Sequence, residues 1–452
     1  MRKLKINIST THIIMLSFIT AILIGSALLS LPVSSANGRS VPYIDALFTA
    51  TTSVCVTGLV TLPTFSTWSV FGQIIILLLI QTGGLGIVTI LSGILISFRR
   101  RFGLKDRILV QDAFNLDSMY GIIRFLKNVI RGTFIVEGAG ALLYMTVFVP
   151  EYGLKGIWIS VFNAVSAFCN AGIDIISDNS MCPYALNPVV NITTSLLVIF
   201  GGIGYVVWWD VIRVSKNFPK KKLRCIHDLS LNSKIVITFT AVLLLAGTAV
   251  FLIFEYNNPL TIGNLSFFDK IQVSFFQSMT TRTAGFASVP QQDLTNTSAV
   301  FSLLLMFVGG SPVGTAGGVK TVTMAVLLFS ALAAIKNNDE LSLFKRRISK
   351  QAVSKAVAVI TVSFMIMFIS TLLLSAVTDA DMLDIVYETV SASATVGLTR
   401  DLTPGLNMWG KIIIILTMYL GRIGPISLLI AFNVKKKRNN IIKEPVEKVN
   451  IG

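Results

Sequence analysis

Four glycines recur along the chain, 114, 113 and 112 residues apart, and each closes a short apolar stretch. Glycine at a turn leaves the backbone carbonyls free to point into a shared space, because no side chain blocks them. Rings of carbonyls can replace the hydration shell of a monovalent cation. The spacing therefore predicts a selectivity filter for a small cation, formed by each glycine and the two residues before it. These residues are Val56, Thr57, Gly58, Asn170, Ala171, Gly172, Thr283, Ala284, Gly285, Thr395, Val396 and Gly397.

The charges around these turns favour a monovalent ion. No aspartate or glutamate occupies the glycine positions or the three residues before them, and divalent ions prefer carboxylate cages. Three acids follow the turns, and they either raise the cation concentration at the outer mouth or are simply solvated: Asp174, Asp178 and Asp401. An aromatic residue stands ten positions before each glycine, which marks the copies as one repeat: Phe48, Phe162, Phe275 and Tyr387.

The composition places these turns in a membrane protein. The chain has 452 residues, of which 53% are hydrophobic and only 13% are charged, and its mean hydropathy is +0.75. Soluble chains carry about 25% charged residues. This composition excludes a soluble enzyme, a nucleic-acid-binding protein and a disordered chain. The net charge of +16 comes from basic residues in short loops, which indicates membrane orientation rather than nucleic-acid binding.

Eight apolar runs are long enough to cross a lipid bilayer, which takes about 20 residues. They lie at 12–32, 70–97, 129–149, 188–212, 232–254, 298–334, 352–377 and 407–432. A stretch too short to cross lies within each consecutive pair and is expected to form a re-entrant half-helix: 44–57, 158–171, 271–284 and 383–396. A half-helix that enters from outside points its C-terminal end, with about −0.5 of an elementary charge, at the centre, where it attracts a cation.

The expected fold class is an all-α polytopic membrane protein. It has four tandem repeats of span, pore half-helix and span, in a pseudo-fourfold arrangement around one central pore. The repeats are expected at 1–98, 99–212, 213–335 and 336–432, followed by a tail at 433–452. Basic residues concentrate in the loops between repeats and in the tail, so the positive-inside rule places both termini in the cytoplasm. Residues 104–127 are expected to form either a cytoplasmic surface helix or an ordinary linker.

A second set of glycines begins 24 to 29 residues after each filter glycine. Two copies read Gly-Gly-x-Gly, at 83–86 and 201–204, and the fourth copy, at 421–424, reads Gly-Arg-Ile-Gly. The third copy opens into a longer stretch at 309–318, which cannot remain a regular helix. Helix packing through small residues is the plainer interpretation of this set, above all for the two Gly-Gly-x-Gly copies.

Three charged residues fall within or beside the expected spans. A charge at the bilayer centre costs about 2.5–3.5 kcal/mol on insertion scales, so Arg422 is expected to face the pore or a partner group. There it either repels a second cation or bonds the carbonyls of the third glycine stretch. Glu137 is expected to be protonated, paired or directed into the helix bundle. Arg282 either braces its filter loop from behind or lies exposed at the filter entrance.

The chain carries no pattern typical of an enzyme. It has no clustered metal ligands and no nucleophile elbow, and its four cysteines have neither metal-like spacing nor a disulfide pattern. Residues 317–321, Gly-Gly-Val-Lys-Thr, are superficially similar to a phosphate-binding loop, but they lie inside an expected span with no preceding strand. We therefore expect no cofactor on this chain, and any nucleotide to bind a partner.

The fourfold pattern, Thr-Val-Gly-Leu at 395–398 and Gly-Arg-Ile-Gly-Pro at 421–425 resemble the Trk/Ktr/HKT superfamily of potassium transporters, over about residues 10–432. Together with the length and short N-terminus, Thr-Thr-Arg-Thr-Ala-Gly-Phe at 280–286 is most similar to the membrane subunit of the bacterial Ktr system. The resemblance implies potassium uptake across the bacterial cytoplasmic membrane by a homodimer. It also implies a cytoplasmic ring of RCK/KTN-type regulatory subunits that bind ATP, ADP or another nucleotide. Whether sodium is coupled or only activating stays open.

The resemblance further implies a gate below the filter, formed by an intramembrane loop that obstructs the pore. The residues it assigns to this gate are Gly309, Gly310, Ser311, Gly314, Thr315, Gly317, Gly318, Lys320 and Arg422.

The filter departs from the tetrameric potassium-channel pattern, and this leaves alternatives. Each loop has one filter glycine, and Leu59, Ile173, Phe286 and Leu398 stand where the channel motif continues with Tyr-Gly. A poorly selective or sodium-permeable cation transporter is therefore the main alternative. In the resembling family, glycine in all four loops accompanies potassium transport, whereas serine in the first loop points to sodium. A secondary transporter of an organic solute is less favoured, because its repeats are typically inverted or paired.

Overall fold

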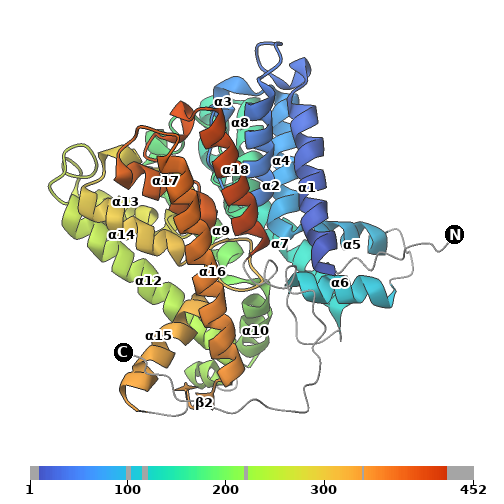
Figure 1. Cartoon of the computed structure of the whole chain (residues 1–452), viewed down its shortest axis with the longest axis vertical. Coiled ribbons are helices and arrows are strands. Elements are labelled where there is room, and N and C mark those ends of the chain that lie inside the picture. The colour runs from blue at the N-terminus through green and yellow to red at the C-terminus, as the bar shows by residue number, and fades with distance from the viewer. Residues whose placement is uncertain (1–9, 98–102, 115–120, 218–221, 338–340, 425–452) are drawn as a thin grey trace.

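The computed structural model describes residues 10–97, 103–114, 121–217, 222–337 and 341–424. These residues are predominantly helical, as Figure 1 shows, and so agree with the predicted all-α class. The helices are α1 (Thr10–Leu29), α2 (Tyr43–Cys55), α3 (Thr64–Thr67), α4 (Val70–Leu85), α5 (Ile87–Ser97), α6 (Leu104–Phe114), α7 (Ile122–Tyr152), α8 (Leu154–Cys169), α9 (Pro188–Ile203), α10 (Tyr205–Ser215), α12 (Leu231–Glu255), α13 (Phe267–Thr280), α14 (Asn296–Phe307), α15 (Thr321–Ile335), α16 (Lys350–Ser375), α17 (Met382–Ala394) and α18 (Met408–Ile423). A short hairpin pairs β1 (Ser342–Leu343) with β2 (Arg346–Arg347).

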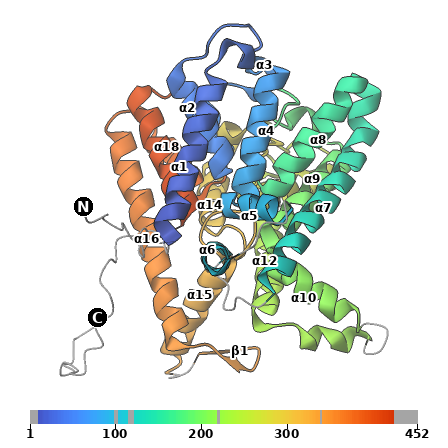
Figure 2. The ribbon, with the colours of Figure 1, turned by 90° about the vertical axis from the view of Figure 1, so that its right-hand side faces the viewer.

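Four of the described helices, α1, α7, α12 and α16, are each long and apolar enough to cross a membrane without a break. They lie where the first apolar run of each pair is expected. In Figure 2, α1, α7 and α16 run through much of the height of the molecule. Their exposed apolar side chains, such as Leu23, Leu142 and Leu373, form a surface suited to lipid rather than water.

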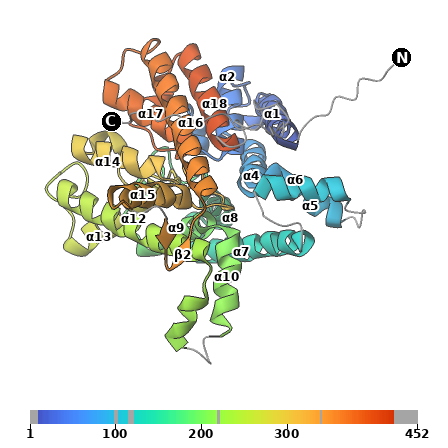
Figure 3. The ribbon, with the colours of Figure 1, turned by 60° about the horizontal axis from the view of Figure 1, so that its bottom comes forward.

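The second apolar run of each pair is not a continuous helix in the described residues. The expected span 70–97 divides at Gly86 into α4 and α5, and the span 188–212 bends by 98° between α9 and α10. Figure 3 shows α10 leaving the main body of helices. In the span 298–334, α14 and α15 are separated by residues 308–320. In the last run, α18 ends at Ile423, and 425–432 lie outside the described residues, as does the expected tail.

Four short helices, α2, α8, α13 and α17, lie where the pore half-helices are predicted, with bounds that differ by a few residues. Their aromatic residues pack inside the protein, since Phe48, Phe162 and Tyr387 are fully buried. In the third short helix the buried ring is Phe276, whereas the predicted Phe275 is only partly buried. The third copy therefore keeps an aromatic residue ten positions before its glycine, and Phe275 packs against the core while the neighbouring Phe276 is the fully buried ring.

The predicted surface helix at 104–127 is only partly described. Residues 104–114 form α6, residues 115–120 are outside the described part, and 122–127 are already the first turns of α7. Val110 of α6 is buried in an apolar cluster with Val88 of α5 and with Leu126 of α7. The helix α6 therefore packs against the bundle through Val110 and the partly buried Leu109, and it is a separate helix from α7.

Candidate ion pathway

The four predicted filter glycines lie side by side in a closed ring, in the order of the chain. A β-carbon placed on Gly58 would lie 2.6 Å from the carbonyl oxygen of Ala171 and 3.3 Å from the Cα of Gly172. A β-carbon on Gly172 would likewise meet the Ala284 carbonyl, one on Gly285 the Val396 carbonyl, and one on Gly397 the Thr57 carbonyl. Each glycine is thus packed against the carbonyl that precedes the next glycine, and a larger residue would displace that carbonyl.

The residue two positions before each glycine adopts a left-handed backbone conformation. The φ angles are +55° at Val56, +60° at Asn170, +63° at Thr283 and +51° at Thr395. This region is unfavourable for residues other than glycine, and three of these four are β-branched. Sequence reasoning missed this feature, because only asparagine among the four has a preference for it. Strained backbone of this kind persists where surrounding contacts hold it, often at functional sites.

Each filter loop is held by a hydroxyl group from its own pore helix. The Gly58 amide donates to Thr52 Oγ1 at 2.9 Å, and the Gly397 amide donates to Ser391 Oγ at 3.1 Å. In the second loop Ser166 Oγ accepts from the Ile173 amide at 3.2 Å, and in the third Thr280 Oγ1 donates to the Phe286 carbonyl at 2.6 Å. The turn after each helix is therefore built from local contacts within one repeat.

Several polar side-chain atoms in the loops are buried without a hydrogen-bond partner among the described residues. They are Thr57 Oγ1, Asn170 Nδ2, Thr283 Oγ1 and Thr395 Oγ1. Buried polar atoms are normally paired with protein or water. The three unpaired hydroxyl oxygens suit contact with water or a passing cation, whereas the Asn170 amide nitrogen, which only donates, suits water.

The second glycine set has two structural roles, helix packing and helix termination, and only the packing is predicted for the two Gly-Gly-x-Gly copies. The first glycine of a copy permits close helix packing, since a β-carbon on Gly83 would meet the Val54 carbonyl, and one on Gly421 the Ser393 carbonyl. The last glycine ends a helix, with φ of +83° at Gly86, +90° at Gly204 and +84° at Gly424. Small-residue packing alone therefore does not describe these copies, because each also breaks its helix at a position that favours glycine.

Residues 308–320, called the intramembrane loop after their predicted position, lie against the end of α9 and against the second filter loop. The Ser311 amide donates to the Gly202 carbonyl at 2.8 Å, and the Thr315 amide donates to the Gly201 carbonyl at 3.1 Å. The Thr315 hydroxyl lies 2.8 Å from Asn170 Oδ1, which belongs to the predicted filter. The loop also reaches the fourth filter loop, because a β-carbon on Gly317 would collide with the Thr395 hydroxyl.

Arg422 joins this loop to the first repeat. Its guanidinium donates to the Thr315 carbonyl at 2.7 Å and to the Gly83 carbonyl at 2.5 Å. Of the two roles expected for Arg422, the structure thus has the one in which it bonds the glycine stretch, through the Thr315 carbonyl. Lys320 caps the loop from its other end, with Nζ 2.7 Å from the Ala316 carbonyl oxygen.

Of the remaining charged candidates, Arg282 and Glu137 are buried, whereas Asp178 is exposed. Arg282 is 8% exposed and donates to the Gly309 carbonyl at 3.2 Å, so it reaches the intramembrane loop and is not an exposed entrance charge. Glu137 is 4% exposed and accepts from Gln81 Nε2 at 3.3 Å, which joins α7 to α4. Of the outer acids, Asp178 accepts from the Ser66 hydroxyl at 2.7 Å.

A family model described as TrkH, a cation transport protein, matches residues 3–444. The Ktr system potassium uptake protein B of Bacillus subtilis is 39% identical, over 96% of this chain and 95% of its own length. The potassium/sodium uptake protein NtpJ of Enterococcus hirae is 35% identical, over 100% of this chain and 99% of its own. The crystal structure of the potassium transporter TrkH from Vibrio parahaemolyticus has the same fold, with a TM-score of 0.73 at 16% identity, covering 95% of this chain and 86% of that one.

The resemblance drawn from the filter and the Gly-Arg-Ile-Gly run is confirmed by these full-length matches. The chain belongs to the TrkH family of cation transport proteins, and it is accordingly a multi-pass protein of the cytoplasmic membrane and not an enzyme.

Proposed function

We propose that this chain is the potassium-translocating membrane subunit of a Ktr-type uptake system. The observation that carries the proposal is the closed ring in which each filter glycine abuts the carbonyl before the next glycine. A ring of carbonyls without carboxylates suits a dehydrated monovalent cation. The membrane potential supplies about 2.3 kcal/mol per charge per 100 mV for inward movement. Two relatives at 35% and 39% identity carry potassium uptake in their names.

A poorly selective or sodium-permeable pathway is the second candidate. Each filter loop offers one glycine, so fewer backbone carbonyls are arranged than in the longer channel motif. The relative from Enterococcus hirae is named for both potassium and sodium uptake. Under this candidate the pore is the same, and sodium crosses it or activates it.

We infer that the gate is the intramembrane loop together with Arg422. Hydrogen bonds from a charged donor are each worth about 1.5–3 kcal/mol, and Arg422 makes two such bonds that join the loop to the first repeat. With the loop seated, backbone fills the space below the ring. Opening then requires these bonds to break or exchange.

The wider architecture belongs to the same proposal. Four repeats surround one pore, and both termini lie in the cytoplasm. The chain crosses the membrane eight times, and four of these spans are broken at glycines or by the intramembrane loop. Two such subunits form a dimer, and a cytoplasmic ring of RCK/KTN-type subunits that bind ATP or ADP controls the loop. Relatives named as proteins of a Ktr system support a multi-subunit assembly.

The test is potassium uptake into liposomes that contain the purified chain, with rubidium and sodium in competition, with and without a nucleotide-binding partner. Saturable potassium uptake that excess sodium does not suppress, and that partner and nucleotide modulate, is the expected result. Equal sodium and potassium permeation would favour the second candidate. No cation flux under any condition would overturn the proposal and would favour the alternative of an organic-solute transporter.

A further inference from the structure

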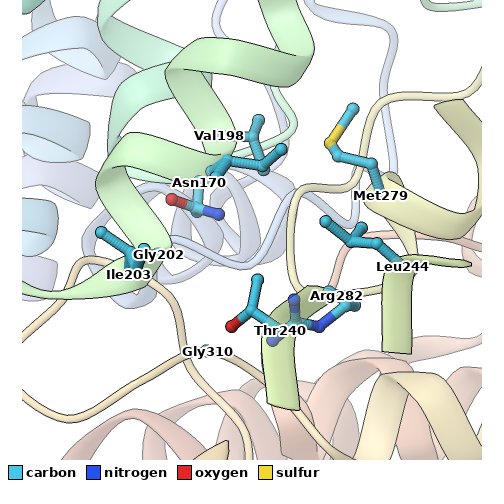
Figure 4. Close-up of a pocket in the computed structure, with 10 residues that line it drawn as sticks. Asn170, Val198, Gly202, Ile203, Thr240, Leu244, Met279, Arg282 and Gly310 are labelled. Atoms are coloured by element: carbon cyan, nitrogen blue, oxygen red, sulfur yellow. The ribbon is translucent and has the colours of Figure 1, made fainter. Parts of the chain in front are cut away.

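A small cavity lies at membrane depth between the second and third filter loops. Figure 4 shows that it is bordered by Asn170 of the second loop, by Arg282 of the third, and by Thr240 of α12, with Gly310 of the intramembrane loop below. Val198, Leu244 and Met279 close it with apolar side chains. The cavity therefore touches two predicted filter loops and the predicted gate at once.

Each of its three polar side chains has a buried atom without a partner among the described residues: Asn170 Nδ2, Thr240 Oγ1 and Arg282 Nε. These residues are at least nine-tenths buried, with 1%, 9% and 8% of their surface exposed. One unpaired atom could reflect a local packing fault. Three from separate segments around a single cavity indicate a shared ligand, since buried polar atoms are normally paired.

The size of the cavity restricts that ligand. Its free space is about 20 Å³, and one water molecule needs about 10–15 Å³ measured in this way. Two of the three unpaired atoms are N–H donors, and the third, a hydroxyl, both donates and accepts. The ligand must therefore accept hydrogen bonds, which excludes a metal cation. Phosphate and carboxylate groups are too large.

Charge decides between water and a halide ion. Arg282 lies two residues beyond the last residue of α13, Thr280, where the helix dipole already offsets a positive charge. Its guanidinium also donates to the Gly309 carbonyl. The positive charge of the Arg282 guanidinium is therefore already balanced by nearby groups. Because no anion is needed there, a neutral ligand suits the site.

Resting on the proposed function, we propose that this cavity holds one ordered water molecule that positions the gate. Asn170 Oδ1 lies 2.8 Å from the Thr315 hydroxyl, and Arg282 Nη2 donates to the Gly309 carbonyl at 3.2 Å. These contacts hold the intramembrane loop at two points, and the water between Asn170 and Arg282 joins them. It accepts from both side chains and donates to Thr240 Oγ1. The seated loop is thereby tied to two filter loops together.

Occupancy is tested without reference to transport, by X-ray radiolytic footprinting of the full chain in lipid nanodiscs. Radicals formed from a bound water oxidise an adjacent methionine to its sulfoxide. Met279 lines the cavity and is 1% exposed, whereas Met306 is equally buried and does not line it. We expect Met279 to be oxidised several-fold faster than Met306. Equal rates would show a dry cavity and overturn the proposal, and a Met279 rate that falls as chloride is raised would assign the site to a halide instead.

The positioning role is tested with Thr240→Val, which keeps the shape of the side chain and removes its hydroxyl. Thr238→Val is the matched control, because Thr238 lies on the same helix and is exposed. We expect Thr240→Val to slow Met279 oxidation and to raise partner-free potassium uptake about three- to tenfold, the range of one hydrogen bond. The control should change neither.

The outcomes separate the site from the transport function. If Thr240→Val slows Met279 oxidation but leaves potassium uptake unchanged, the unmodified protein does bind the water, but the water does not position the gate. Absence of potassium uptake in the unmodified chain would sink the proposed function, while the footprinting comparison would still decide whether the cavity is occupied.

Discussion

The predicted filter loops and the intramembrane loop are both non-helical backbone between helices, but their hydrogen bonds differ in origin. In the filter, Thr52 and Ser391 bond the glycine amides of their own repeats. In the intramembrane loop, Ser311 and Thr315 bond carbonyls of the second repeat, and Arg422 adds a link from the fourth repeat. Hydrogen bonds within one repeat preserve the shape of each filter turn, whereas a loop that is hydrogen-bonded across repeats responds when the repeats shift. The first suits selection and the second suits gating.

The largest effect is expected for Gly397→Ser, which should change ion preference because it alters only the predicted filter. The new β-carbon would collide with the Thr57 carbonyl, and φ at this position is +97°, where a side chain adds about 1–2 kcal/mol of strain. The preference for potassium over sodium should fall by about tenfold or more, with normal assembly on size-exclusion chromatography. Gly405→Ser is the control, because a β-carbon there meets nothing within 4 Å. Unchanged preference in a well-folded Gly397→Ser protein would count against the filter assignment.

Arg422→Ala should have the next largest effect, on the loop alone. It removes the two bonds to the Thr315 and Gly83 carbonyls, each worth about 1.5–3 kcal/mol for a charged donor. Partner-free potassium flux in liposomes should rise at least tenfold. The control is Arg39→Ala, at an exposed arginine in a loop, which should leave the flux unaltered. Flux at the level of the unmodified protein in both variants would remove Arg422 from the gate.

A smaller rise in flux is expected for Thr315→Val. This change removes the hydroxyl that lies 3.0 Å from the Phe168 carbonyl oxygen and 2.8 Å from Asn170 Oδ1. The hydroxyl has one hydrogen to donate to these two acceptors, and the loss of one neutral hydrogen bond of about 0.5–1.5 kcal/mol predicts a three- to tenfold increase in partner-free flux. A changed ion preference instead would mean that the loop belongs to the filter, and the contrast between the two regions would fail.

The smallest effect is expected for Ser391→Ala, which removes the acceptor of the Gly397 amide at 3.1 Å. The potassium preference should fall about two- to fivefold, as one neutral hydrogen bond predicts, while partner-free flux stays constant. Ser375→Ala, at an exposed serine of α16, serves as the control. Raised flux with an intact preference would show that this serine supports the gate rather than the filter.

Much of the arrangement could be predicted from spacing. The interval between glycines indicated four equivalent turns, and the turns meet in one ring. Apolar length indicated the unbroken helices α1, α7, α12 and α16. These features follow from composition and period, which a sequence displays directly.

Other features depend on the three-dimensional arrangement of the chain, which a sequence does not display. The left-handed backbone at Val56 and Thr395 opposes the local preference of β-branched residues, and it occurs where each residue caps the end of its pore helix. In the sequence, Gly204 looks like an ordinary small residue within an apolar run, and nothing there indicates that the helix breaks at it. The reach of Arg282 to the Gly309 carbonyl depends on where α14 ends. Tertiary packing decides each of these.

The most direct test of the separation between selection and gating is to measure flux and ion preference in the same liposomes, for the unmodified chain and Arg422→Ala, without a partner. The account predicts that Arg422→Ala raises potassium flux at least tenfold while the potassium-to-sodium preference stays that of the unmodified chain. A loss of preference that accompanies the rise, or no rise at all, would contradict it.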